Sequence, residues 1–291
     1  MKVSGFTFIR NGIKFGYPFT ESIRSILPIC DEFVIALGDC TDGTREAILA
    51  IDSPKIKIID TIWDESKRDG GRILAEQTNI ALDHISGDWG FYLQGDEVVH
   101  ERYFPVIRKA MEAELNNEAI DGLLFNYLHF YGSYDFVATA RNWYRKEIRI
   151  VRNDKRIRSW GDAQGFRRLS DSGSMEKLTV KQVDAYIYHY GWVKPPKVMQ
   201  EKLRSFHKLW HSDEWVDKEM QGDEFDYSNI NALARFTTGH PVTMHCLIEK
   251  KNWPFEPPQH VKVSFKHWFS NTIEQATGIR LGEYKNYKLV K

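Results

Sequence analysis

The sequence predicts an α/β protein whose mostly parallel sheet is covered by helices on both faces. The first observation is the alternation of short apolar runs with amphipathic segments over the first 115 residues. Such alternation favours parallel strands, because each helix returns the chain to the same edge of the sheet. The second observation is composition: 42% of the 291 residues are hydrophobic and 13% are aromatic. This supply of apolar side chains is sufficient for a large core.

The expected elements of the first half follow one another in order. Apolar runs predict strands, and apolar side chains at helical spacing predict helices. Pro18 suits the first turn of the helix expected at 18–26, and Thr41 or Asp42 can cap the helix expected at 44–51. The expected strands are 3–9, 32–37, 55–60 and 89–93. The expected helices are 18–26, 44–51, 72–85 and 103–115.

The pattern changes after about residue 120. Strand-like runs at 123–130, 147–151 and 185–190 are separated by fewer helices, and aromatic residues become more frequent. The segment Lys194-Pro195-Pro196-Lys197 marks a break, because proline ends regular structure. The second half therefore predicts strands that are added to the sheet without intervening helices.

A helix is expected at 198–210, followed by a segment of different character. Apolar side chains fall on one side of that helix: Met199, Leu203, Phe206 and Trp210. Residues 211–291 are polar, aromatic and interrupted by proline. We expect one domain over residues 1–210 and a helical C-terminal appendage, 211–291, packed on the same domain.

Charge and cysteine content exclude several classes of protein. Lys plus Arg and Asp plus Glu both number 40, so the net charge supports neither nucleic-acid binding nor a general membrane-surface role. Cys30, Cys40 and Cys246 are few, odd in number and scattered, so a disulfide framework is not expected. We expect a reducing, cytoplasmic environment, since the N-terminus lacks a signal-peptide pattern and no apolar run could span a bilayer.

Acidic turns follow two of the expected strands. The apolar run 90–93 leads into Gln94-Gly95-Asp96-Glu97, and the run 33–37 leads into the acidic, glycine-containing turn 38–44. Open α/β sheets bind ligands at the carboxyl ends of their strands, so these turns predict a site for a charged or metal-bound ligand. The letters Gln-Gly-Asp-Glu recur at 221–224 without a preceding apolar strand, and we expect that copy to be an exposed turn.

Four segments share an order and spacing with a known family. They are the end of the first strand with Thr7, Arg10 and Asn11; Asp39-Cys40-Thr41-Asp42-Gly43-Thr44; the stretch from the helix 71–79 through Gly87-Asp88-Trp89 to Leu93-Gln94-Gly95-Asp96-Glu97; and Tyr188-His189-Tyr190-Gly191-Trp192. Together they resemble the nucleotide-sugar-dependent glycosyltransferases of family 2, which have the GT-A fold. The resemblance covers about residues 3–210. It implies a Rossmann-like mixed sheet flanked by helices.

The resemblance also implies a function and a cofactor. The activity is transfer of a sugar from a nucleotide-sugar donor to a glycan or lipid-linked acceptor, with inversion, in surface polysaccharide biosynthesis. Mn²⁺ or Mg²⁺ held by Asp96 and His189 would spread the charge that develops on the departing diphosphate. Gln94 replaces the first Asp of the family's metal motif, which predicts weaker or partial metal dependence. Each proposed ligand also has an explanation without a metal: Asp96 could be a solvated acid in a loop, and His189 could be a histidine of the core.

The donor-binding residues follow from the resemblance as well. Thr7, Arg10 and Asn11 would line the part of the site that holds the base and ribose, with Gln94 and Gly95 beside the sugar diphosphate. Asp39 would accept a hydrogen bond from the base or ribose, with helix capping as the competing explanation, whereas capping is the favoured explanation for Asp42. Arg72 stands at a helix start near the expected diphosphate, where a plain surface arginine is the competing explanation.

Inversion requires a general base that removes the proton from the acceptor hydroxyl. By resemblance this is an acid that follows the metal-binding strand, and Asp162 is our candidate. Gly161 exposes it, and Trp160 could stack on a sugar ring. Asp162 could instead be an exposed acid in a turn, and Asp135 and Glu147 are the other candidates for the general base.

A basic run could bind an anionic acceptor, or it could be a solvated strand edge that deters edge pairing. It consists of Arg141, Arg145, Lys146, Arg149, Arg152, Lys155, Arg156 and Arg158. The chain would then work in the cytoplasm, at or near the inner face of the membrane, with peripheral membrane contact left open and the oligomeric state undetermined.

Two other functions are compatible with the same residues. A sugar nucleotidyltransferase usually carries a glycine-rich phosphate loop after its first strand, and residues 8–14 have too few glycines for that. A non-catalytic glycan- or nucleotide-binding protein of the same fold remains an alternative because Gln94 brings no charge to the metal site.

Overall fold

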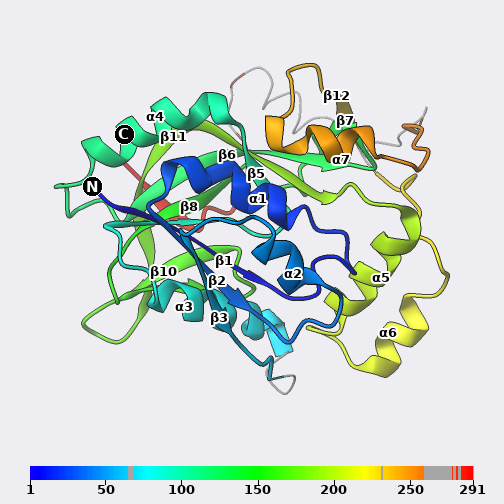
Figure 1. Cartoon of the computed structure of the whole chain (residues 1–291), viewed down its shortest axis with the longest axis horizontal. Coiled ribbons are helices and arrows are strands. Elements are labelled where there is room, and N and C mark those ends of the chain that lie inside the picture. The colour runs from blue at the N-terminus through cyan, green and yellow to red at the C-terminus, as the bar shows by residue number, and fades with distance from the viewer. Residues whose placement is uncertain (65–68, 231, 259–276, 278–279, 281–282, 291) are drawn as a thin grey trace.

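A mixed sheet forms the centre of the molecule in the computed structural model, which describes residues 1–64, 69–230, 232–258, 277, 280 and 283–290. Its main strand order is β3-β2-β1-β4-β8-β6-β11-β10-β9 (Figure 1). The strands on this path are β1 (Val3–Ile9), β2 (Glu32–Leu37), β3 (Ile56–Asp60), β4 (Trp89–Tyr92), β6 (Gly122–Tyr131), β8 (Lys146–Arg152), β9 (Ile157–Trp160), β10 (Gly165–Leu169) and β11 (Met175–Trp192).

Strand direction divides the sheet into two parts. Strands β3, β2, β1 and β4 are parallel, as the sequence predicts. β8 runs antiparallel between β4 and β6, whereas β6 and β11 are parallel to each other. The predicted α/β class with a mixed sheet flanked by helices is confirmed. The parallel part brings the carboxyl ends of β1, β2 and β4 to the same edge, and the two acidic turns follow β2 and β4 there.

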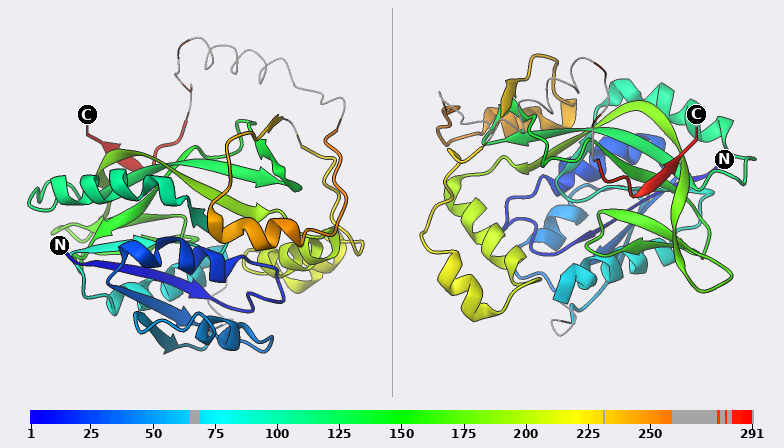
Figure 2. Two further views of the ribbon diagram at one scale, coloured as in Figure 1. Left: turned by 45° about the horizontal axis from the view of Figure 1, so that its top comes forward. Right: turned by 180° about the vertical axis from the view of Figure 1, so that it is seen from behind.

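Helices cover both faces of the parallel part. The alternating side chains of β2 show this division: Phe33, Ile35 and Leu37 pack with α1, α2 and α4, whereas Val34 and Ala36 pack with α3. Figure 2 shows α1 and the sheet strands as successive layers. The helices are α1 (Phe19–Ile26), α2 (Thr44–Leu49), α3 (Arg72–Asp83) and α4 (Phe104–Ala113).

The C-terminal segment, expected as a helical appendage, contributes strands to the sheet in addition to helices. Its described part contains two short helices and two strands, and the strands join the sheet: β12 pairs with β7, and β13, red in Figure 2, pairs with β11. Residues 259–276, a large part of the expected appendage, lie outside the described residues. The helices and strands of this segment are α6 (Asp213–Glu219), β12 (Leu233–Arg235), α7 (His245–Glu249) and β13 (Tyr287–Leu289), and β12 pairs with β7 (Ser133–Ala138) from the earlier part of the chain.

The strand-edge explanation of the basic run is wrong for β8. This strand lies between β4 and β6, so it is an interior strand. Arg149 is fully buried there, and Arg152 donates to the carbonyl oxygens of Glu114, Leu115 and Ile120. These arginines therefore hold loops and turns together. Among the described helices, none is long and apolar enough to cross a membrane.

Candidate active site

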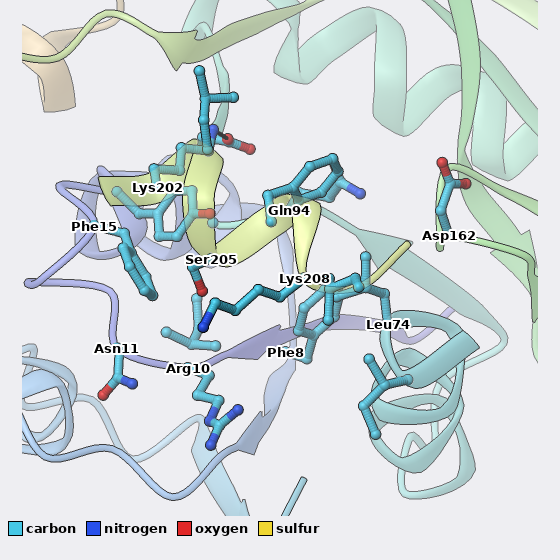
Figure 3. Close-up of a pocket in the computed structure, with 18 of the residues that line it drawn as sticks. Phe8, Arg10, Asn11, Phe15, Leu74, Gln94, Asp162, Lys202, Ser205 and Lys208 are labelled. Atoms are coloured by element: carbon cyan, nitrogen blue, oxygen red, sulfur yellow. Dashed lines mark hydrogen bonds and ion pairs between the residues drawn. The ribbon is translucent and has the colours of Figure 1, made fainter. Parts of the chain in front are cut away.

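A cavity of about 580 Å³ opens at the carboxyl ends of β1 and β4. The helix α5 (Pro196–His207) covers it, with Ser205 on the helix and Lys208 just after it both facing the space (Figure 3). The residues of the sequence prediction that line it are Arg10, Asn11, Gln94, Gly95, Asp96, Asp162 and His189. The fold thus brings the proposed donor, metal and base residues, which are far apart in the sequence, to one cavity.

Three predicted donor residues lie outside the wall of this cavity. Thr7 is buried within β1, and Arg72 is exposed at the start of α3. Asp39 lies close by and pairs with Arg10, whose Nε is 3.0 Å from the Asp39 carboxylate. Asp42 accepts hydrogen bonds from the Thr44 amide and hydroxyl at the start of α2, but the N-cap position of this helix is occupied by Gly43 and not by Thr41 or Asp42 as the sequence predicts.

The turn after β4 directs its two acids to opposite sides. The Gln94 amide donates to the Glu97 carboxylate (3.0 Å), and the Glu97 amide donates to the Gln94 carbonyl (3.0 Å). Asp96 is thereby left facing the cavity, whereas Glu97 points into the core and is fully buried. The copy at 221–224 is exposed and irregular, as expected from its lack of a preceding strand.

A buried ion pair fixes this turn to β8. Arg149 donates from Nε and Nη2 to the two Glu97 oxygens, each at 2.7 Å, and both side chains are fully buried. The Tyr127 hydroxyl donates to the same carboxylate, and Arg149 also donates to the Gln164 carbonyl. One guanidinium therefore links the Asp96 turn to the loop that carries Asp162. Bidentate pairs of this kind are geometrically specific.

The register of β11 places His189 next to Asp96. Strand β5 (Glu97–Val99) pairs with β11 so that Glu97 is opposite His189, and β6 pairs with β11 so that His129 is opposite His189. Gly191 allows this approach, because a Cβ there would lie 2.7 Å from both the Asp96 carboxylate and the His189 ring.

The hydrogen bonds of the two histidines determine which nitrogen of His189 carries the proton. His129 Nε2 faces the Tyr144 carbonyl at 2.7 Å and must donate to it, so His129 Nδ1 is an acceptor. His189 Nδ1, 3.1 Å away, then donates to it. The lone pair of His189 Nε2 consequently points toward Asp96 Oδ1, at a distance of 3.7 Å. Metal-binding histidines are commonly oriented by such a second hydrogen bond.

Charges around this pair favour a neutral histidine and an ionised aspartate. Burial lowers the pKa of His189 to about 4, although Asp96 opposes the shift. Burial acts to raise the pKa of Asp96, but the neighbouring groups, with the Lys202 ammonium as the largest contributor, together outweigh it and hold that pKa well below its usual range. Lys202, from α5, donates to Asp96 Oδ2 at 3.1 Å. Both forms are those that a metal ion requires of its ligands.

Asp96 and His189 fit a divalent cation as a pair of ligands. A carboxylate oxygen and a nitrogen lone pair face each other across a short gap, and the donor set suits Mn²⁺ or Mg²⁺. No third histidine, cysteine or acid joins them to form a larger cluster in the part of the chain that the structure describes. The remaining ligands would have to be waters or substrate oxygens, as is usual for Mg²⁺.

Backbone conformation presents Asp162 at the other side of the cavity. It lies between β9 and β10, flanked by Gly161 and Ala163, both with φ of 63°. A positive φ is unfavourable for alanine, so the surrounding structure must hold this turn in place. Asn79 of α3 does so in part, since it exchanges hydrogen bonds of 2.8 and 3.2 Å with the Ser159 backbone.

Neither rival base lines the cavity. Asp135 is exposed and bonds to Ser133. Glu147 is buried beneath the cavity wall, where it accepts hydrogen bonds from Gln164 (3.2 Å) and Asn286 (2.9 Å). Trp160 is 53% exposed and also lies outside the cavity wall, so the sugar-stacking role suggested for it has no support there.

The buried Glu147 carboxyl predicts a pH-dependent stability. Burial raises its pKa from 4.5 to about 7, and the nearby Arg149 charge offsets this only in part. The folded protein therefore binds this proton more tightly than the unfolded chain, so stability falls as pH rises from about 4.5 to about 7. Glu147→Gln is expected to exceed wild-type stability at pH 8 by up to about 3 kcal/mol, with no advantage at pH 4. Urea unfolding at both pH values tests this, and an equal difference at both would contradict it.

Solved structures similar to this chain include two proteins. The TarS structure from S. aureus (residues 1–349) is 15% identical over 75% of this chain and 69% of that chain, with a TM-score of 0.39. A second TarS structure is 17% identical over 75% and 42%, with a TM-score of 0.41. Glucosyl-3-phosphoglycerate synthase from Mycobacterium tuberculosis, in complex with Mn²⁺, UDP and phosphoglyceric acid, is 18% identical over 45% and 43%, with a TM-score of 0.30.

Both proteins are GT-A family 2 glycosyltransferases, the family that this sequence resembles. The chain spans less than half the length of the second TarS chain and of the synthase. No protein-family model matches the sequence, and no curated protein matches it.

Proposed function

We propose that this chain is an inverting glycosyltransferase that moves a sugar from a nucleotide-sugar donor to a glycan or lipid-linked acceptor with the help of a divalent cation. One observation supports this above the others. A single cavity at the strand ends contains a cation-binding pair, Asp96 and His189, and a separate carboxylate, Asp162, on a constrained turn. Sugar transfer needs these two functions at two different places, one at the leaving group and one at the acceptor.

Each residue then has a distinct part in the reaction. Arg10 and Asn11 bind the nucleotide end of the donor, and Asp96 with His189 would hold the divalent cation. When bound, that cation stabilises the negative charge of the leaving diphosphate. The oxygen of the acceptor hydroxyl bonds to the anomeric carbon while the bond from that carbon to the diphosphate breaks. Asp162 accepts the proton that this hydroxyl loses. Attack from the face opposite the leaving group inverts the anomeric centre.

Aromatic side chains form part of the cavity wall. Trp143, Tyr144 and Trp192 line it together with His129, and their flat faces suit the apolar C–H surface of a sugar ring. This favours a glycan or a glycan carried on a lipid as acceptor. Surface polysaccharide synthesis in the cytoplasm, at the inner face of the membrane, is the setting we propose for such a reaction.

Thermal stabilisation by nucleotides tests the proposed function. UDP, GDP, CMP and dTDP are each added with and without Mn²⁺, because a ligand that binds only the folded protein raises its melting temperature. One nucleotide is expected to raise it in a metal-dependent manner, and at 100 times its Kd the gain is about 2.7 kcal/mol. Asp96→Asn should lose the metal-dependent part of the shift and most of the transfer activity. Full activity in Asp96→Asn, or no shift with any nucleotide, would contradict the proposal.

A further inference from the structure

Lys202 occupies an unusual position beside the proposed metal ligands. Its ammonium donates to Asp96 Oδ2 at 3.1 Å and to the Gly191 carbonyl at 2.9 Å, and it lies 4.9 Å from the centre of the Tyr17 ring. The side chains of Lys202 and Asp96 are only 12% and 9% exposed. A carboxylate this deeply buried needs a counter-charge, and Lys202 supplies it in the donor-free protein.

The same carboxylate cannot keep both cations at close range. A divalent ion on Asp96 would repel an ammonium a few ångströms away, and the repulsion is strong where water is scarce. Lys202 can leave, because it lines the open cavity on a long flexible stem. The neighbouring Lys194 cannot do the same: it is 1% exposed, bonds to the Gly16 carbonyl at 2.7 Å and is not part of the cavity wall.

We propose that Lys202 is an exchangeable counter-ion that neutralises Asp96 in the empty site and becomes a ligand of the donor diphosphate once a divalent cation takes its place. Ser205 and Lys208, at the C-terminal end of α5, face the same cavity as Arg10, so this end of the helix presents donors to an anion there (Figure 3). Binding of the donor diphosphate by Lys202 rests on the proposed function. The exchange of Lys202 for a cation at Asp96 follows from the contacts of Lys202 and does not depend on that function.

Removal of the charge should affect the two ligands in opposite directions. In Lys202→Gln, Asp96 loses its competing cation, so Mn²⁺ measured without nucleotide should bind about tenfold more tightly. UDP or GDP, whichever the protein accepts, should bind about tenfold more weakly in saturating Mn²⁺, because one phosphate ligand is gone. A residue with a merely structural role would weaken both. Mn²⁺ binding is followed by the spin-resonance signal of the free ion, and nucleotide binding by calorimetry.

Two variants serve as controls. Lys202→Arg keeps the positive charge and should retain near wild-type Mn²⁺ affinity. Lys208→Gln removes a cavity-lining cation that pairs with Asp213 at 3.6 Å and not with Asp96, so its Mn²⁺ affinity should be unchanged. Melting temperatures establish that each variant is folded. If Lys202→Gln is not folded, Lys202→Met is used in its place.

The outcomes separate this inference from the proposed function. If no nucleotide binds to the wild type, the proposed function fails, and the Mn²⁺ measurement still decides the exchange at Asp96. Equal Mn²⁺ affinity in wild type and Lys202→Gln, or tighter Mn²⁺ binding with unchanged UDP and GDP binding, would overturn the proposal.

Discussion

Asp162→Asn is expected to lower the rate of sugar transfer by a factor of about 10²–10⁴, the usual contribution of a positioned general base. Asparagine has nearly the same shape, so the turn and its bond to the Gln164 amide (3.3 Å) should persist. The variant would lose only the capacity to take a proton from the acceptor. Nucleotide and Mn²⁺ binding should therefore match the wild type, which calorimetry and steady-state transfer assays on the same preparation can show.

The two rival acids provide matched controls. Asp135→Asn changes an exposed side chain, and Glu147→Gln changes a buried one beneath the cavity wall. Neither should reduce transfer by more than a few-fold. If Glu147→Gln abolishes transfer while Asp162→Asn retains it, Glu147 is the base and the assignment made here is wrong.

Much of the fold could be predicted from local sequence pattern. The strands Val3–Ile9 and Glu32–Leu37 begin and end where expected, because mostly apolar runs of this length are typical of buried parallel strands. The second half was harder to predict. β11 spans Met175–Trp192, yet only 185–190 reads as a strand, since the rest of it is polar and pairs with neighbours that are far away in the sequence.

The candidate site shows the same limit. The position of Asp96 at the cavity could be predicted because it follows an apolar strand, whereas the identical letters at 221–224 lie in an exposed turn. His129 and Lys202 could not be predicted, because nothing near them in sequence signals their role. His129 reaches the site through the register of β6 with β11, and Lys202 through the packing of α5 over the cavity. Both are consequences of tertiary structure.

The role of Arg149 could not be predicted from the sequence. In the sequence it is one member of a basic run, and only the interior position of β8 shows that its charge is buried. Its guanidinium lies 5.3 Å from the ring centres of both Tyr92 and Tyr127, so it is enclosed by aromatic faces as well as by Glu97. It also donates to the Gln164 carbonyl, so this one side chain connects the turn of Asp96 to the loop of Asp162.

Arg149→Met is expected to cost about 3–5 kcal/mol of folding free energy, because it leaves the buried Glu97 carboxylate without its counter-charge. The double variant Arg149→Met with Glu97→Gln should recover part of this loss, since no unpaired charge then remains and Tyr127 keeps an oxygen to donate to. Arg156→Met, which breaks the exposed pair with Asp154 at 3.1 Å, should cost no more than about 1 kcal/mol. Urea unfolding of the four proteins measures these differences. A loss in Arg149→Met no larger than in Arg156→Met would mean that the buried pair does not hold the turn of Asp96 in place.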